Sequence, residues 1–268
     1  MNDQSLIPIP ALTLIKLTPD ALAIARWARS KGIAAFEYGL GYAAHAAAKA
    51  VFGDLAPQPF SMRMKDGRME LLGYTAASVA ALSKVAALQT HDELAAQALG
   101  VDAMVAKAMP VDWAAGERYS FECRVVPTRR TRQLREGRYL EVDAAMPEGG
   151  PEVPMNRDAA YKAWLGTELG RFGAARLAGF APFAFKLTAT ARRTQAAKSK
   201  DRQSMRGLVP DLVARGELEV TDAAGFSALL ARGLGRHRAF GFGCLLLAPQ
   251  GVLFSHELAA RQLADVDA

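Results

Sequence analysis

The chain has 268 residues, of which 51% are hydrophobic and 22% are charged. This length is sufficient for two domains with their own cores, and the composition is too apolar for a disordered chain. The formal charge of +6 favours a polyanionic partner only if the excess is concentrated on part of the surface.

The cysteine content and the N-terminus exclude several classes of protein. Cys123 and Cys244 lie in apolar segments and are the only cysteines, which excludes a disulfide framework and a cysteine-based zinc site. Met1 to Leu6 lack the basic and apolar regions of a signal peptide, and no stretch reaches the ~18 uninterrupted apolar residues of a membrane span. We therefore expect a soluble, cytoplasmic protein with no membrane partner.

The chain opens with a predicted strand and two predicted helices. Residues 11–17 have the composition of a strand. Thr18 at the N-cap and Pro19 at the first helical position predict a helix over 19–31. A second, alanine-rich helix is predicted over about 38–52.

A hairpin follows these helices. Segments 59–65 and 68–74 flank Asp66-Gly67, a dipeptide that favours a type I′ turn because both residues can adopt positive φ. This order is the opening of a split β-α-β unit. Residues 76–99 are again helical in pattern, with Thr90 and Asp92 as cap sites for a second short helix.

An arginine strip follows in the middle of the chain. Residues 119–126 alternate in polarity and predict a half-buried strand. The strip, residues 118–138, contains seven arginines and two glutamates. Such a strip is typical of a protein that contacts a phosphate backbone, and a solvated arginine-rich loop has the same composition.

The best internal boundary is the Gly/Pro-rich segment 146–154, which predicts domains at 1–148 and 149–268. A helix over about 157–171 and a strand over 180–190 follow it. We then expect a strand over 216–220, a helix capped by Thr221, and a strand over 240–248. The order of elements predicts an α+β fold of two units, each an antiparallel sheet with helices on one face.

A second basic strip, residues 186–206, contains seven lysines and arginines against Asp201. Its central part, about 191–207, predicts an inserted basic finger that orders on RNA, with a disordered surface loop as the alternative. The residues outside the two strips carry a net negative charge. The positive charge is therefore concentrated, which is typical of a nucleic-acid-binding protein.

Two features indicate chemistry. Tyr38, Tyr42 and His45 recur at helical spacing, so a phenol and an imidazole on one face could donate and accept protons; an amphipathic core stripe is the alternative. The second feature is a glycine-rich loop, residues 233–243, in which arginines flank His237. This loop follows a helix and precedes a strand, which excludes a Rossmann or P-loop motif.

These residues carry a resemblance to a known family. Residues 216–222, Phe226 and residues 233–249 look like the C-terminal glycine-rich signature of CRISPR-associated repeat-processing endoribonucleases of the RAMP superfamily. The likeness is greatest to the type I-E enzyme. Three further stretches agree in order, namely Tyr42-Ala-Ala-His45 with Val51-Phe52, Pro59-Phe60-Ser-Met-Arg63, and Tyr161-Lys-Ala-Trp164-Leu165.

The resemblance implies two ferredoxin-like (RRM-like) domains and a metal-independent, cofactor-free endoribonuclease. Such an enzyme cleaves precursor CRISPR RNA at the 3′ base of the repeat hairpin by 2′-hydroxyl attack, which leaves a 2′,3′-cyclic phosphate. It then keeps the mature crRNA within a complex of other CRISPR subunits. The helix over 19–31, the alanine-rich second helix and the long basic finger depart from the family, which fits a less typical system such as type IV.

The resemblance also assigns site residues. His45 and Tyr42 match the catalytic pair, and Tyr38, Arg26 or Arg238 could share the task if the helix is shifted. The residues expected to bind RNA are Arg129, Arg130, Arg132, Arg192, Arg193, Lys198, Lys200, Arg202, Arg206, Gly233, Gly235, Arg236, His237, Arg238, Gly241 and Gly243.

The sequence leaves two other functions open. A non-catalytic crRNA-binding subunit of a CRISPR complex would use the same loop and strips without cleaving. A general basic nucleic-acid-binding protein would show an affinity that follows salt and ignores the repeat.

Overall fold

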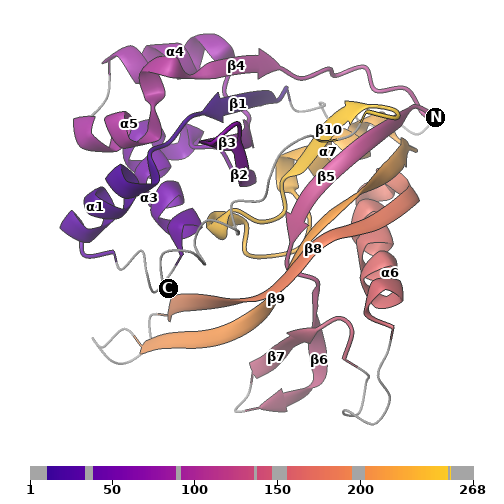
Figure 1. Ribbon diagram of the computed structural model, residues 1–268. Helices are drawn as coiled ribbons and strands as arrows, with labels where there is room; N and C mark the ends of the chain where they lie inside the picture. Colours follow the sequence, from indigo (N-terminus) through magenta and orange to yellow (C-terminus); the bar gives the residue numbers. More distant parts are fainter. Residues whose placement is uncertain are drawn as a thin grey trace, which may run out of the picture.

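The computed structural model describes residues 11–33, 39–88, 92–135, 138–146, 156–194, 203–252 and 254. In these residues the strands form two four-stranded antiparallel sheets and a separate two-stranded hairpin (Figure 1). Each four-stranded sheet belongs to one ferredoxin-like unit, which confirms the predicted α+β class.

The first unit has the strand order β2-β3-β1-β4. Its helices lie against one face of the sheet, where Ile15 and Leu17 of β1 are fully buried. Its elements are β1 (Thr13–Leu17), α1 (Ala21–Ser30), α3 (Leu40–Phe52), η1 (Gly53–Leu55), β2 (Phe60–Lys65), β3 (Arg68–Thr75), α4 (Val79–Leu88), α5 (Glu93–Leu99), η2 (Val101–Ala103) and β4 (Val105–Ala108).

Local signals set most boundaries in this unit. Asp66 and Gly67 have φ of 51° and 73°, as the predicted type I′ turn requires. Asp92 caps α5 as expected, because its Oδ1 accepts a hydrogen bond from the backbone N–H of Ala95 at 3.1 Å. The predicted cap of the first helix is wrong: α1 is capped by Asp20, whose carboxylate accepts from Ala23 N at 2.8 Å.

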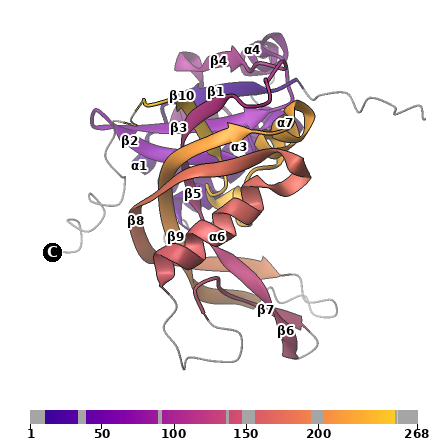
Figure 2. The same ribbon diagram turned by 90° about the vertical axis from the view of Figure 1, so that its right-hand side faces the viewer.

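The second unit repeats the arrangement with the strand order β10-β5-β9-β8. Helices α6 and α7 cover one face of this sheet (Figure 2). The hairpin β6–β7 is inserted between the first strand and the first helix. The elements are β5 (Arg118–Val125), β6 (Thr128–Arg135), β7 (Arg138–Asp143), α6 (Arg157–Leu169), η3 (Arg171–Gly173), β8 (Ala175–Thr194), β9 (Gln203–Val220), α7 (Ala223–Arg232), η4 (Arg238–Phe240) and β10 (Leu245–Pro249).

The sheet pairing moves the predicted domain boundary. Strand β5 pairs with β9 and β10, so the second unit begins at Arg118 and the boundary at 148/149 falls too late. The Gly/Pro composition of 146–154 correctly marks a connection, but composition does not tell which sheet the preceding strand joins. The division between the two sheets lies between Ala108 and Arg118.

Three further predictions in the second unit need correction. Asp222, and not Thr221, caps α7 through a 2.6 Å hydrogen bond from Gly225 N. Strand β9 begins at Gln203 and is far longer than the predicted 216–220. It can contain Pro210 because this residue lies beyond the part paired with β5, where β8 is the only neighbouring strand and one edge is free. Residues 240–244 precede β10, because Gly241 and Gly243 have φ of 84° and 82°.

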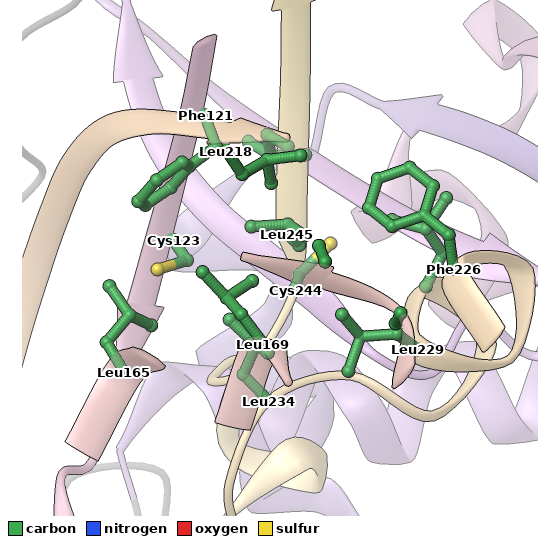
Figure 3. Packing of buried hydrophobic residues seen from close by; sticks show 14 of the residues in the cluster. Phe121, Cys123, Leu165, Leu169, Leu218, Phe226, Leu229, Leu234, Cys244 and Leu245 are labelled. Atoms are coloured by element: carbon green, nitrogen blue, oxygen red, sulfur yellow. The ribbon is translucent and has the colours of Figure 1, made fainter. Parts of the chain in front are cut away.

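Two hydrophobic clusters form the core. One lies between the first sheet and its helices. The other lies within the second unit and includes Leu72 and Tyr74 of the first, so the two units are packed together. Figure 3 shows Cys123 and Cys244 among the leucines of this second cluster. Both are free and buried, and burial raises the pKa of both thiols.

Among the described residues, the structure contains no helix with the length and apolar character needed to cross a membrane.

The phenol of Tyr74 joins the two units, since its hydroxyl donates to the backbone oxygen of Leu245 at 2.8 Å in a buried environment. We expect Tyr74→Phe to lower the free energy of unfolding by about 1 kcal/mol, because a buried acceptor loses its partner. The control is Tyr119→Phe, whose hydroxyl donates to the exposed Glu117; its effect should stay below about 0.5 kcal/mol. Urea unfolding measures both, and equal effects would contradict this role of Tyr74.

Candidate functional site

Tyr42 and His45 lie on α3, the helix that opens after Gly39. Alanines 43, 44, 47 and 48 bury the opposite side of the helix in the core, which leaves Tyr42 and His45 half-buried. Tyr42 stacks on Phe240 with a centroid distance of 5.3 Å, and His45 lies parallel to Phe60 at 6.2 Å. The predicted catalytic pair is therefore held between β2 and the glycine-rich loop.

Helix α3 and the glycine-rich loop are in close contact. A Cβ atom at Gly41 would collide with the backbone oxygen of Phe240, and a Cβ at Gly241 would lie 3.3 Å from the ring of Phe60. Only glycine at position 41 allows η4 to approach the first turn of α3. The two sequence features that indicated chemistry are thus brought together in space.

The imidazole of His45 is placed to accept a proton. Burial, and then the positive charge of Lys49 one turn away, lower its pKa below 6.5. The ring is therefore neutral at neutral pH. Its Nδ1 atom is buried and has no hydrogen-bond partner among the described residues.

Two other residues, Arg26 and Tyr38, are assigned to catalysis by the resemblance. Arg26 is exposed on α1, which packs against α3. Tyr38 lies outside the described residues.

The glycine-rich loop is folded by its own backbone. Leu234 N donates to Gly243 O at 2.8 Å, and Gly243 N donates to Arg124 O at 2.7 Å. Gly233, Gly235, Gly241 and Gly243 all have positive φ. A Cβ at Gly233 would lie 2.8 Å from Pro59, so this glycine also permits close contact with the first unit.

The basic side chains of this loop have partners within the protein. Arg236 Nη1 and His237 Nε2 each lie 3.3 Å from a carboxylate oxygen of Glu141 on β7. Arg238 donates to Arg232 O at 2.5 Å, and burial together with the positive charge of Arg232 lowers its pKa. The sequence led us to expect these residues as phosphate ligands. In the structure their side chains are instead bonded to other parts of the protein and hold the loop in place.

The arginine strip is divided between two elements: its first part is strand β5, and its second part, from Thr128, lies on the hairpin β6–β7. Arg130 is exposed, and Arg129 is half-buried with Nη2 donating to Met146 O at 2.7 Å. Arg132 lies on β6. Arginines are thus presented on a two-stranded hairpin and not on a loop.

The described residues of the basic finger, 191–194 and 203–207, lie on the paired strands β8 and β9. Arg192 and Arg193 lie on β8 and Arg206 lies on β9, while Lys198, Lys200 and Arg202 lie outside the described residues. In both views the two basic hairpins, β6–β7 and β8–β9, project from the same end of the second sheet (Figures 1 and 2).

Three site residues are not assigned by the sequence. Phe60 is part of the family resemblance but receives no role from it, and the sequence pattern places Phe240 in a strand. Glu141 has no signal, because in the sequence a single glutamate just after a basic strip is indistinguishable from a solvated one. Across the described residues, no group of three or more His, Cys, Asp or Glu side chains is arranged to hold a metal ion.

The protein is thus built of two ferredoxin-like units that contact each other at the glycine-rich loop. The family described as "CRISPR associated protein" matches residues 13–249, and the chain belongs to this family. A search of curated proteins gives no match.

Solved structures share the fold. CRISPR endoribonuclease Cse3 bound to 19 nt RNA matches with a TM-score of 0.58 and 19% identity, over 88% of this chain and 100% of that chain. Thermus thermophilus Cse3, bound to an RNA representing a pre-cleavage complex, matches with a TM-score of 0.53 and 19% identity, over 89% and 100%. CRISPR-associated protein Cas6e from Escherichia coli str. K-12 matches with a TM-score of 0.50 and 19% identity, over 89% and 99%.

The contact between α3 and the loop generates a prediction. We expect Gly41→Ala to destabilise the protein by about 2 kcal/mol, since the new methyl group collides with a backbone carbonyl that cannot move freely. Gly166→Ala on α6 is the matched control: a Cβ atom at this position would have no atom within 4 Å, so the change should stabilise by about 0.5–1 kcal/mol. Thermal unfolding tests both, and an unaffected Gly41→Ala protein would contradict the close packing.

Proposed function

We propose that this protein is a metal-independent endoribonuclease that cleaves precursor CRISPR RNA at the 3′ base of the repeat hairpin and retains the product. The observation that carries the proposal is the half-buried His45, whose pKa is lowered by burial and by Lys49. It lies against Phe60 and one turn from Tyr42, which stacks on Phe240 of the glycine-rich loop. The family membership and the similarity to Cse3 and Cas6e support it.

In the proposed reaction the RNA supplies its own nucleophile. The 2′-oxygen attacks the adjacent phosphorus, and the bond from phosphorus to the 5′-oxygen breaks. The products are a 2′,3′-cyclic phosphate and a 5′-hydroxyl. A neutral imidazole such as His45 can accept the proton of the 2′-hydroxyl, and a second group must protonate the leaving oxygen. This chemistry requires acid–base groups and cationic stabilisation of the phosphate, and it requires no activated water.

The two basic hairpins are the proposed RNA-binding elements. A-form RNA is contacted mainly through its shape and its phosphates. Two hairpins that leave the same end of the second sheet carry the arginines in question, namely Arg129, Arg130, Arg132, Arg192, Arg193 and Arg206. Lys198, Lys200 and Arg202 extend the same basic finger in sequence. Retention of the crRNA with other subunits is supported by the similarity to a chain of a CRISPR RNA-guided surveillance complex, at a TM-score of 0.51 and 17% identity.

The activity is tested with repeat RNA from the same genome. We expect cleavage in excess EDTA, a 2′,3′-cyclic phosphate on the upstream product, and no cleavage when the scissile nucleotide carries a 2′-deoxy sugar. A denaturing gel with and without phosphatase treatment reads the result. Binding without cleavage would favour the non-catalytic subunit, and affinity independent of the repeat would favour a general nucleic-acid-binding protein.

The role of His45 is tested by rate and pH. We expect His45→Ala to slow single-turnover cleavage at saturating RNA by about 100-fold or more while binding is retained. In the native protein the rate should rise with pH through the pKa of His45, below 6.5, and level off above it, because only the neutral ring accepts a proton.

Lys49→Gln provides the matched test of this assignment. Removing the nearby positive charge should raise the pKa of His45 and shift the midpoint of the pH–rate profile upward. Lys31→Gln is the control, since Lys31 at the end of α1 pairs with Asp92 at the start of α5 and is not among the charges that shift the pKa of His45. An unchanged midpoint in Lys49→Gln would assign the pH dependence to another group.

A further inference from the structure

Glu141 lies where the hairpin β6–β7, called the arginine hairpin below, meets the glycine-rich loop. From the hairpin itself, Thr128 Oγ1 donates to Glu141 Oε1 at 2.5 Å. From the loop, Arg236 Nη1 and His237 Nε2 approach the two carboxylate oxygens, both at 3.3 Å. One carboxylate therefore joins two strands of the hairpin to two consecutive residues of the loop.

The surroundings of Glu141 keep its carboxylate ionised. Burial opposes its ionisation, but the hydrogen bonds from His237 and Thr128, with the charges of His237 and Arg236, lower its pKa to about 2. The side chain of His237 is only 5% exposed. Its backbone has φ of +60°, a conformation that ordinary residues adopt at an energetic cost.

Packed residues of the loop connect Glu141 to helix α3, which carries the candidate catalytic pair. The ring of His237 lies 5.9 Å from that of Phe240 in an edge-on arrangement, and Phe240 in turn stacks on Tyr42 at 5.3 Å. The same residue, Phe240, abuts Gly41 with its backbone oxygen. A continuous series of packed groups thus connects Glu141 to the first turns of α3.

The hairpin has separate contacts to α6. Trp164 Nε1 donates to Thr128 O at 3.0 Å, and Tyr161 OH donates to Asp143 Oδ2 at 3.0 Å. These bonds hold the hairpin on the second unit whether or not Glu141 is charged. The contact made by Glu141 is different, because it fixes the hairpin relative to the loop and to α3.

We propose that Glu141 is a positioning residue that sets the register between RNA held on the arginine hairpin and the Tyr42–His45 pair. This inference rests on the proposed endoribonuclease function. Arg236 and His237 serve in it as partners of Glu141, and phosphate binding falls to the arginines of the hairpins. A misplacement of the scissile phosphate by a fraction of an ångström is sufficient to slow the reaction.

The principal test is Glu141→Gln, which keeps the size of the side chain and removes its charge. We expect the single-turnover rate at saturating repeat RNA to fall about tenfold, with the dissociation constant changed by less than about threefold. Glu219→Gln is the charge-matched control: Glu219 bridges Arg118 and Arg176 at the end of β5 away from the hairpin, and the rate should remain unchanged.

A second variant guards against misfolding. His237→Asn removes the part of the contact made by His237, and asparagine tolerates positive φ. If His237 acts through Glu141, the double variant should be no slower than Glu141→Gln alone. A native rate in folded Glu141→Gln would overturn the proposal. A purely additive double variant would also overturn it, and so would a loss confined to affinity.

Amide hydrogen exchange separates this proposal from the cleavage activity. In the RNA-free protein, Glu141→Gln should increase exchange in residues 233–243, whereas Glu219→Gln should leave it unchanged. Failure of the native protein to cleave would reject the proposed function. Unchanged exchange in the loop would reject the contact itself, whatever the activity.

Discussion

The packing of Phe240 against the first turn of α3 is the contact on which the rest of the site depends. The backbone oxygen of Phe240 occupies the space that a Cβ atom at position 41 would need, and the ring of Phe240 stacks on Tyr42. Because η4 belongs to the second unit in sequence and α3 to the first, this contact joins the two units at the point where the candidate chemistry lies. Core packing elsewhere tolerates volume-conserving changes, but a backbone-to-backbone approach does not.

The packing of the loop against the first unit changes the role that we assign to its glycines. The sequence indicates that they let a ligand approach the backbone. In the structure their positive φ values and short approaches are used within the protein, at Gly233 against Pro59 and at Gly235 against Trp164. Intramolecular packing therefore accounts for both positions. These contacts hold the loop against both units, as a site requires when two elements must be kept in register.

The fold was predictable because most of its helices and strands are marked by local sequence patterns. A β-α-β-β-α-β order follows from periodicity, the Asp66-Gly67 turn and cap residues, and sheet order then follows from the few topologies that such an order allows. The larger failures were non-local: the domain boundary depended on β5 pairing with β9, and the lengths of β8 and β9 depended on each other. The local failures were small, since each wrong cap, Thr18 or Thr221, lies within two residues of the aspartate that caps the helix. The Tyr42–His45 pair was predictable from spacing, whereas its neighbours Phe60 and Phe240 come from other elements.

Charge is the clearest case in which sequence and structure give different information. Many cations counted in the sequence are neutralised by carboxylates that only the fold brings near: Arg124 by Asp211 at 2.6 Å, Arg215 by Glu122 at 2.8 Å, and Arg236 by Glu141. These pairs fix strands and loops, so their arginines are poor ligands for phosphate. The exposed Arg130 lies on the projecting hairpin β6–β7. Folding thus determines which cations can meet a ligand: the arginines of these ion pairs are occupied by carboxylates, whereas Arg130 on the hairpin is exposed.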